Sequence, residues 1–260
     1  MIMILAYKGI DIFYKDEGKG QAIVMLHGFL ENSTMWQAFL PELTKKNRVI
    51  CIDLLGHGKT GCLGHVHSME LMADAVKAVL NHLNIKPCLL IGHSMGGYVA
   101  LAFAEAYPNA VTRLCLINST AKADSNSKKA QRDRSIQVVK HNHKLFIRLA
   151  ISNLFTKKNR TVFKEDIKYC IEQALKTPLQ GIIAALEGMK IRPNREKILH
   201  AFKHNVTMMI SLNDPLLNSQ DLITEAKSAQ ANIVVFQDGH MAPIENKVEL
   251  LPQLMHFIEY

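Results

Sequence analysis

Short apolar runs that alternate with helical spacing constrain the fold of this chain more than any other feature of its sequence. The apolar runs occupy residues 22–26, 48–53, 87–91 and 111–118, and helical spacing follows at 34–46, 68–83 and 95–107. A run that is apolar throughout is typical of a strand buried on both faces of a parallel sheet. The sequence therefore predicts an α/β fold in which helices flank a parallel sheet.

The alternation is interrupted once, between residues 120 and 196. Residues 121–195 have helical spacing, a basic composition and few β-branched runs. Strand and helix patterns then resume at 206–212, 219–229, 232–236 and 248–260. A chain of 260 residues suits one domain with a single large core. We therefore expect residues 1–120 and 196–260 to form the core and residues 121–195 to form a helical insertion.

The motif Gly92-His93-Ser94-Met95-Gly96-Gly97 lies directly between a predicted strand and a predicted helix. In a Gly-x-Ser-x-Gly elbow the serine occupies a cramped strand-to-helix turn, where glycines let the backbone pack closely. This turn lifts the hydroxyl above the sheet, beside a helix N-terminus that stabilises negative charge. Ser94 is therefore the predicted nucleophile.

A serine hydroxyl needs a base to take its proton, and the base needs an acid to orient it. For this elbow the expected chain order is serine, acid, histidine. Asp214 and His240 each follow a predicted strand, at the edge of the sheet where active sites of open parallel sheets form. We predict Asp214 as the acid and His240 as the base. Asp124, after the strand at 111–118, is the alternative acid.

An oxyanion formed on the substrate also needs hydrogen-bond donors. The backbone N–H of Met95, directly after the nucleophile, is the first candidate. The second is the N–H of Phe29, in the loop after the strand at 22–26, where Gly28 allows a sharp turn. The alternative interpretation is that His27 and Gly28 simply end a strand.

Together these residues resemble the α/β-hydrolase superfamily, in particular its small serine esterase, lactonase and C–C-bond hydrolase branch. The resemblance rests on His27-Gly28-Phe29, Asp53-Leu54-Leu55-Gly56-His57-Gly58, the elbow, Asn213-Asp214 and Gly239-His240. It implies a mostly parallel eight-stranded sheet flanked by helices, with a helical lid at 121–195 inserted after strand six. It also implies structural roles for Asp53 and His57.

A lid in this position lies over the active site, so the resemblance implies that residues 121–195 line the substrate pocket. From the core, Phe29, Met95, His93 and Trp36 are the expected pocket neighbours. Packing between helices is the alternative for Trp36.

Several branches of the superfamily fit the sequence poorly. Haloalkane dehalogenases and epoxide hydrolases carry an aspartate at the elbow, where this chain has Ser94. The menaquinone-pathway lyase usually shows Gly-Tyr-Ser-Leu-Gly-Gly-Arg, whereas His93 and Tyr98 stand here at the Tyr and Arg positions. The Gly-Gly-Gly oxyanion run of lipases is also missing from the sequence.

The formal net charge of +8 originates in one segment. Residues 121–170 hold 13 Lys or Arg against four Asp or Glu, so the rest of the chain is nearly neutral. A solvated helical surface is the simplest interpretation, and attraction of an anionic substrate or an anionic lipid surface is the alternative. No recognition motif accompanies the charge, so a nucleic-acid partner is not expected.

The remaining composition narrows the class of protein. No apolar stretch approaches the roughly 20 residues that span a bilayer, and the N-terminus lacks the features of a secretory signal. Five scattered cysteines without a Cys-x-x-Cys pair favour the cytoplasm and argue against a metal site. Dinucleotide and phosphate-loop fingerprints do not occur, so no cofactor is expected. We expect a monomer or homodimer that acts on a small molecule.

Three functions follow from these expectations. The first is hydrolysis of small carboxylic esters through an acyl-enzyme on Ser94. The second is a lactonase or C–C-bond hydrolase whose anionic substrate is held by lid cations such as Arg132, Arg148 and Arg160. The third is a ligand-binding receptor on the same fold, in which the three predicted site residues take part in binding and turnover is slow.

Overall fold

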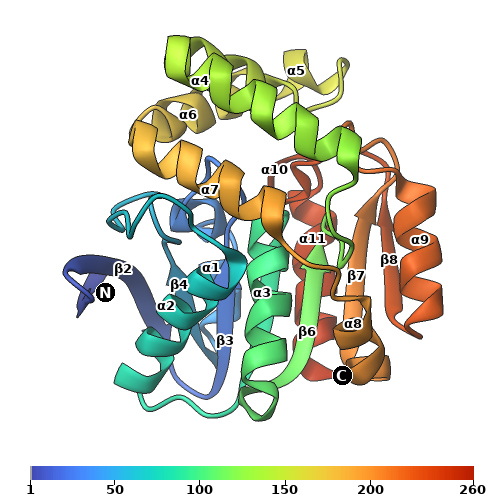
Figure 1. Ribbon diagram of the computed structural model, residues 1–260. Helices are drawn as coiled ribbons and strands as arrows, with labels where there is room; N and C mark the ends of the chain where they lie inside the picture. The colour runs from blue at the N-terminus through green and yellow to red at the C-terminus, as the bar shows by residue number, and fades with distance from the viewer. Residues whose placement is uncertain (1) are drawn as a thin grey trace.

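An eight-stranded, mostly parallel sheet forms the centre of the molecule in the computed structural model, which describes residues 2–260 (Figure 1). The strand order is β1-β2-β4-β3-β5-β6-β7-β8. β2 pairs antiparallel with both β1 and β4, and the other neighbours are parallel. The strands are β1 Ile2–Tyr7, β2 Ile10–Gly18, β3 Gln21–Leu26, β4 Asn47–Ile52, β5 Cys88–His93, β6 Val111–Ile117, β7 Val206–Ser211 and β8 Asn232–Phe236.

The central strands are apolar throughout because both faces of the sheet are covered. Along β3, Val24 and Leu26 face one hydrophobic cluster, while Ile23 and Met25 face a second cluster on the opposite side. Successive side chains of a strand point to opposite faces, so a strand between two helical layers needs apolar residues at every position. This confirms the α/β fold with a mostly parallel sheet.

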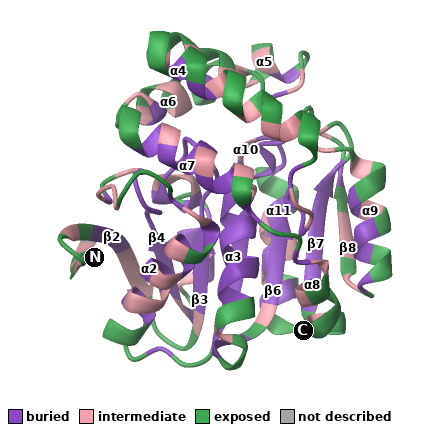
Figure 2. Ribbon diagram, in the orientation of Figure 1, coloured by how far each residue is buried: buried purple, intermediate pink, exposed green. Residues whose placement is uncertain are grey.

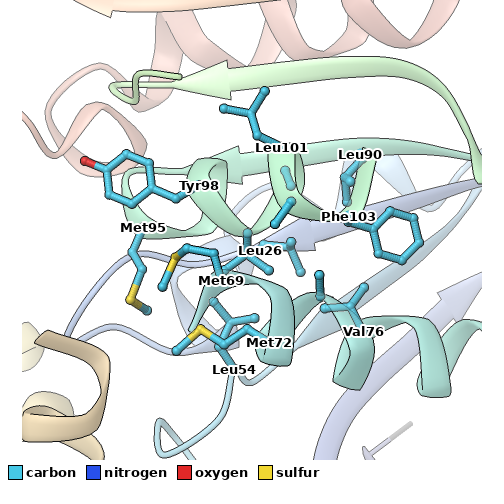
Figure 3. Packing of buried hydrophobic residues seen from close by; sticks show 14 of the residues in the cluster. Leu26, Leu54, Met69, Met72, Val76, Leu90, Met95, Tyr98, Leu101 and Phe103 are labelled. Carbon is cyan, nitrogen blue, oxygen red and sulfur yellow. The ribbon is translucent and has the colours of Figure 1, made fainter. Parts of the chain in front are cut away.

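Helices cover both faces of this sheet. One face packs against α2 Met69–His82, α3 Met95–Ala106, α8 Glu196–Phe202 and α9 Ser219–Ser228, and Figure 3 shows the contact of α2 and α3 with it. The other face packs against η1 Ser33–Trp36, α1 Leu40–Leu43 and α11 Lys247–Glu259. Three further short helices are η2 Pro108–Ala110, η3 Lys203–Asn205 and α10 Ala242–Glu245.

One expected helix is broken. The spacing at 34–46 predicts a continuous helix, whereas the structure has the separate helices η1 and α1 in this region. Pro41 stands at the start of α1 and has no backbone N–H, so a helix could not continue through it with full hydrogen bonding.

Four helices lie between β6 and α8. They are α4 Asn126–Ser152, which is kinked at Asn142, α5 Asn159–Val162, α6 Lys164–Ala174 and α7 Leu179–Ile191. Figure 1 shows them stacked over one end of the sheet. The two ends of the segment meet, because the Arg195 N–H donates to the Ala121 carbonyl at 2.7 Å. The Arg195 guanidinium also pairs with Glu105 of α3 at 2.8 Å and with Glu70 of α2.

Candidate active site

Ser94 occupies a strained turn between β5 and α3. Its backbone has φ +49° and ψ −116°, outside the regions that non-glycine residues ordinarily adopt. A Cβ atom at Gly92 would lie 2.4 Å from the Gly96 carbonyl oxygen, and one at Gly96 would lie 2.3 Å from the Leu26 carbonyl oxygen. Only glycine therefore fits at these two positions. The turn is further fixed by Ser119, whose hydroxyl donates to the Ser94 carbonyl at 2.8 Å.

The structure brings Ser94, His240 and Asp214 together in one hydrogen-bonded chain. The Ser94 hydroxyl donates to His240 Nε2 at 2.8 Å, and His240 Nδ1 donates to Asp214 Oδ2 at 2.7 Å. The other Asp214 oxygen accepts from the N–H groups of Leu216 and Leu217 at 2.8 and 3.1 Å. Asp214 follows β7 and His240 follows β8, so the sheet edge places both beside the elbow.

Asp214 is held as a carboxylate. Burial alone would raise its pKa, but the facing His240 and the hydrogen bonds that it accepts together lower its pKa below the usual 3.8. A carboxylate at this point keeps the proton of His240 on Nδ1, so Nε2 presents a lone pair to Ser94.

The loop after β3 is fixed around Phe29. The Gly28 N–H donates to Glu31 Oε2 at 2.6 Å, and the Gly28 carbonyl accepts from His27 Nδ1 at 2.8 Å. The other nitrogen of His27 accepts from the Leu54 N–H at 2.9 Å. Phe29 lines the same cavity as Ser94 and His240.

Met95 is the first residue of α3, where backbone N–H groups have no partner within the helix. Its N–H therefore lies at the positive end of the helix, directly after Ser94.

His93 does not line the cavity, which corrects the expectation that it is a pocket neighbour. It is fully buried, and its ring lies between Glu31 Oε2, 3.0 Å from Nδ1, and the His240 carbonyl oxygen, 2.9 Å from Nε2. Burial lowers the pKa of His93, but the Glu31 carboxylate outweighs burial and raises it above 6.5. Both ring nitrogens face acceptor oxygens, so the geometry also favours a proton on each nitrogen.

Trp36 does not line the cavity either, and the alternative of helix packing is the one the structure shows. Its side chain is fully buried in the cluster between the sheet, α1 and α11, with its ring centroid 6.3 Å from that of Phe39. This face of the sheet is opposite to the one that carries α3, so the indole is separated from Ser94 by the sheet.

Asn118 is a site residue for which the sequence gives no motif. It follows β6, is fully buried, and donates from Nδ2 to the His240 carbonyl at 2.8 Å and to Ser211 Oγ at 3.0 Å. Its Oδ1 accepts from the Ser211 N–H at 2.9 Å. One amide thus joins the end of β7 to the His240 loop. The sequence signal that could have found Asn118 is its position, since it is a polar residue directly after a buried strand.

Asp124 is not part of the hydrogen-bonded chain with His240. It binds Arg192 Nη1 at 2.6 Å and the guanidinium of Arg132, and the Arg192 guanidinium lies 4.0 Å from the centre of the Tyr98 ring. Burial would raise the pKa of Asp124, but the two arginines lower it below 3.8. The alternative acid is therefore a partner of Arg132 and Arg192.

A cavity of about 630 Å³ lies above Ser94 and His240. Its walls include Phe29 and Tyr98 from the core and residues of α4 and α7, and its apolar lining residues include Val138, Phe146, Leu149, Leu154, Leu186 and Met189. Charged residues of both signs line the wall, namely Lys122, Lys128, Arg132 and Arg192 with Glu31, Asp124, Asp221 and Glu225, whereas Arg148 and Arg160 do not line it. The cavity is large enough for a small organic substrate.

Within residues 2–260, no group of three or more His, Cys, Asp or Glu side chains is arranged to hold a metal ion. No helix in the same range is both long and apolar enough to cross a membrane.

A family model described as the alpha/beta hydrolase fold matches residues 21–247. This match covers most of the chain, together with the elbow and the strands on either side of it. The chain therefore belongs to the α/β-hydrolase family, and it is a hydrolase.

Known proteins resemble this chain to different extents. The structure of a thermophilic esterase from Thermogutta terrifontis with malate bound has a TM-score of 0.92 and 30% identity, covering 99% of this chain and 98% of that one. A putative 2-succinyl-6-hydroxy-2,4-cyclohexadiene-1-carboxylate synthase of Bacillus subtilis is 30% identical over 199 residues, which are 72% of each protein. An uncharacterised protein of Mycobacterium bovis is 36% identical over 106 residues, 41% of this chain but only 31% of that protein's length.

Proposed function

We propose that this hydrolase cleaves small carboxylic esters through an acyl-enzyme on Ser94. The observation that carries the proposal is the hydrogen-bonded chain from Ser94 through His240 to Asp214, with distances of 2.8 and 2.7 Å, below a mostly apolar cavity. The esterase of Thermogutta terrifontis, similar over nearly the whole chain, supports the choice of substrate class.

His240 acts as a general base and then as a general acid in this mechanism. Nε2 takes the proton of the Ser94 hydroxyl as Oγ attacks the ester carbonyl, and Asp214 stabilises the imidazolium that forms. The imidazolium then protonates the leaving alcohol, so the acyl group stays on Ser94. Water, deprotonated by the same nitrogen, releases the acid and restores the serine.

The N–H groups of Met95 and Phe29 are the proposed donors to the oxyanion. Met95 offers its N–H at the start of α3, and the bonds of Gly28 to Glu31 and His27 hold the Phe29 loop in place. Such fixed donors contribute about 2.7–4 kcal/mol each to stabilisation of the transition state.

The segment 121–195 is the proposed lid. α4 and α7 supply much of the cavity wall above Ser94, while the core supplies the reacting groups. In this proposal the segment mainly determines which substrate binds, and the core cleaves the bond.

The decisive test is the Ser94→Ala variant with short-chain p-nitrophenyl esters. We expect the wild-type protein to release nitrophenol and the variant to lose at least about 10⁴-fold in kcat. A fluorophosphonate probe is expected to add its mass to the peptide that contains Ser94, and only in the wild type. Hydrolysis by Ser94→Ala at the wild-type rate would overturn the proposal.

A second candidate is an anionic substrate, such as a lactone or a C–C-cleavage substrate that bears a carboxylate. Lys128 in the cavity wall favours it, since its ammonium group bonds only a backbone carbonyl, that of Leu216 at 3.1 Å. Matched esters with and without a distal carboxylate separate the two candidates. The anionic substrate is supported if the carboxylate ester has the lower KM and this KM rises with salt. The difference in KM between the two esters should then be lost in Lys128→Gln. Equal KM values for the two esters exclude it.

A further inference from the structure

The outer side of α4 exposes apolar side chains to solvent. Val138, Leu145 and Leu149 are 46%, 50% and 54% exposed, and Figure 2 shows long exposed stretches of α4. Leu145 and Leu149 lie after the kink at Asn142 and are four residues apart, so they are neighbours on one side of the helix. Adjacent large apolar side chains that are half exposed to water indicate a surface that binds an apolar partner.

Cations accompany these leucines along α4. Lys144 and Arg148 are exposed and immediately precede Leu145 and Leu149, so the two cations form a second row beside the two leucines. Lys140 is exposed four residues before Lys144, on the other side of the kink at Asn142. Residues 134–164 contain eight Lys or Arg and no Asp or Glu. The surface therefore combines positive charge with apolar contacts.

We propose that this surface, formed by Lys140, Lys144, Leu145, Arg148 and Leu149 and called here the α4 face, docks on an anionic lipid bilayer. Lysine and arginine are attracted to the negative surface of such a bilayer, and leucines from an amphipathic helix enter the boundary between headgroups and acyl chains. A nucleic acid would engage the cations and leave both leucines in water. The row of cations beside the row of leucines therefore favours a lipid bilayer over a nucleic acid.

Docking on this face would place the cavity beside the bilayer. Val138 and Leu149 belong to the wall of the cavity above Ser94 as well as to the exposed side of α4. An amphiphilic molecule could then pass between the bilayer and the cavity with a short path through water. Vesicle binding is measured without turnover, so it is independent of the proposed ester hydrolysis.

Flotation with vesicles tests the proposal on the full chain. The probes are vesicles of phosphatidylcholine alone and vesicles with about 30% phosphatidylglycerol, at about 0.05 and 0.5 M salt. We expect binding to the anionic vesicles at low salt, little binding to the neutral vesicles, and release from the anionic vesicles at high salt. Failure to float with anionic vesicles at low salt would overturn the proposal, as would equal binding to neutral vesicles.

Two variants separate the α4 face from general basicity. Lys144→Gln/Arg148→Gln is expected to weaken the partition coefficient about 25-fold, since each cation near an anionic surface contributes about five-fold. The matched control is Lys197→Gln/Lys203→Gln, which removes the same charge from exposed positions in α8 and η3, at the other end of the sheet (Figure 1). Equal losses of vesicle binding in the two double variants would show that only net charge matters, and would overturn the assignment of the docking surface to α4.

The apolar part of the proposal has its own test. Leu145 does not line the cavity, so Leu145→Ser is expected to weaken vesicle binding several-fold while hydrolysis of a water-soluble ester stays unchanged. Val248→Ser, at an 83% exposed position of α11, is the matched control and is expected to bind like the wild type. Unchanged binding by Leu145→Ser would show that leucine does not contact lipid and would contradict the proposed docking.

Discussion

At the scale of single residues, His240 is held through its backbone as well as through its ring. Its carbonyl oxygen accepts from Asn118 Nδ2 at 2.8 Å and from His93 Nε2 at 2.9 Å. Two fixed donors on one carbonyl restrict rotation of the peptide, so the imidazole stays within hydrogen-bond reach of Ser94. Glu31 extends this support, because it accepts from His93 and from the Gly28 N–H of the Phe29 loop.

Replacement of Glu31 tests that support. Glu31→Gln would leave the buried His93 without its counter-ion, and loss of one partner of a buried pair costs about 3–5 kcal/mol. We expect the free energy of unfolding in urea to fall by about 3 kcal/mol. The control is Glu42→Gln, which removes an exposed pair with Lys45 and is expected to cost less than about 1 kcal/mol. Equal losses would contradict the structural role of Glu31.

The same pair predicts a dependence of stability on pH. The pKa of His93 is raised in the folded state, so its contribution is full below about pH 6.5 and is lost as pH rises through the raised pKa. The pKa of Glu31 is lowered despite burial, chiefly by His93, so its contribution is present above about pH 4.5 and is lost as pH falls through the lowered pKa.

In Glu31→Gln the counter-ion that keeps His93 protonated is missing. Burial then lowers the pKa of His93, so we expect the alkaline loss of stability that His93 causes in the wild type to be missing from the variant. Urea unfolding midpoints of both proteins between about pH 5 and pH 9 would measure this. Parallel curves over that range would show that His93 does not carry the proton.

At the scale of elements, the elbow depends on close contact between β3, β5 and α3. A Cβ at Gly96 would meet the backbone of Leu26, which cannot move without displacing a central strand. We expect Gly96→Ala to lower the free energy of unfolding by at least about 2 kcal/mol and to reduce kcat. Gly64→Ala is the control, because nothing lies within 4 Å of its added Cβ and only its φ of +78° opposes the change. That control is expected to cost about 1 kcal/mol.

The sequence predicts the strands of the core better than the insertion. β3 to β7 are each an apolar run bounded by turns, since burial on both faces leaves that pattern in the chain. Ser68, expected to begin a helix, does accept from the Leu71 N–H at 3.2 Å at the start of α2. Within 121–195, Pro178 and Pro193 mark breaks in the helical pattern, and they stand just outside the two ends of α7. The other helices could not be separated, because their apolar residues face the core, the cavity and solvent in turn. The kink at Asn142 has no sequence signal.

The residues of the site also differ in how well the sequence predicts them. The elbow and the two loops that carry Asp214 and His240 could be located, because each position follows a recognisable strand in a fixed chain order. Glu31 and Asn118 could not, since a single buried polar residue in a loop is defined only by partners distant in sequence. The side chains of His93, Trp36 and Met95 were expected at the pocket, and the structure instead places all three in the interior.

At the scale of the whole molecule, the insertion and the sheet share one hydrophobic cluster. Ile147 and Ile151 of α4 are buried in the same cluster as Leu26 and Leu90 of the sheet. We therefore expect Ile151→Ala to cost about 2–4 kcal/mol in the single unfolding transition of the whole chain. Urea unfolding followed by far-UV and near-UV circular dichroism would measure it. A separate early transition that Ile151→Ala alone shifts would show that the insertion unfolds on its own.

The 2.7 Å bond between the Arg195 N–H and the Ala121 carbonyl has a consequence for evolution and for engineering. Because the insertion leaves and re-enters the core at one point, its length is not constrained by the spacing of β6 and β7. Lengthening a loop whose ends already meet costs little free energy. The segment above Ser94 can therefore change in length without changing the register of the sheet below, provided that the residues it packs on the core are kept.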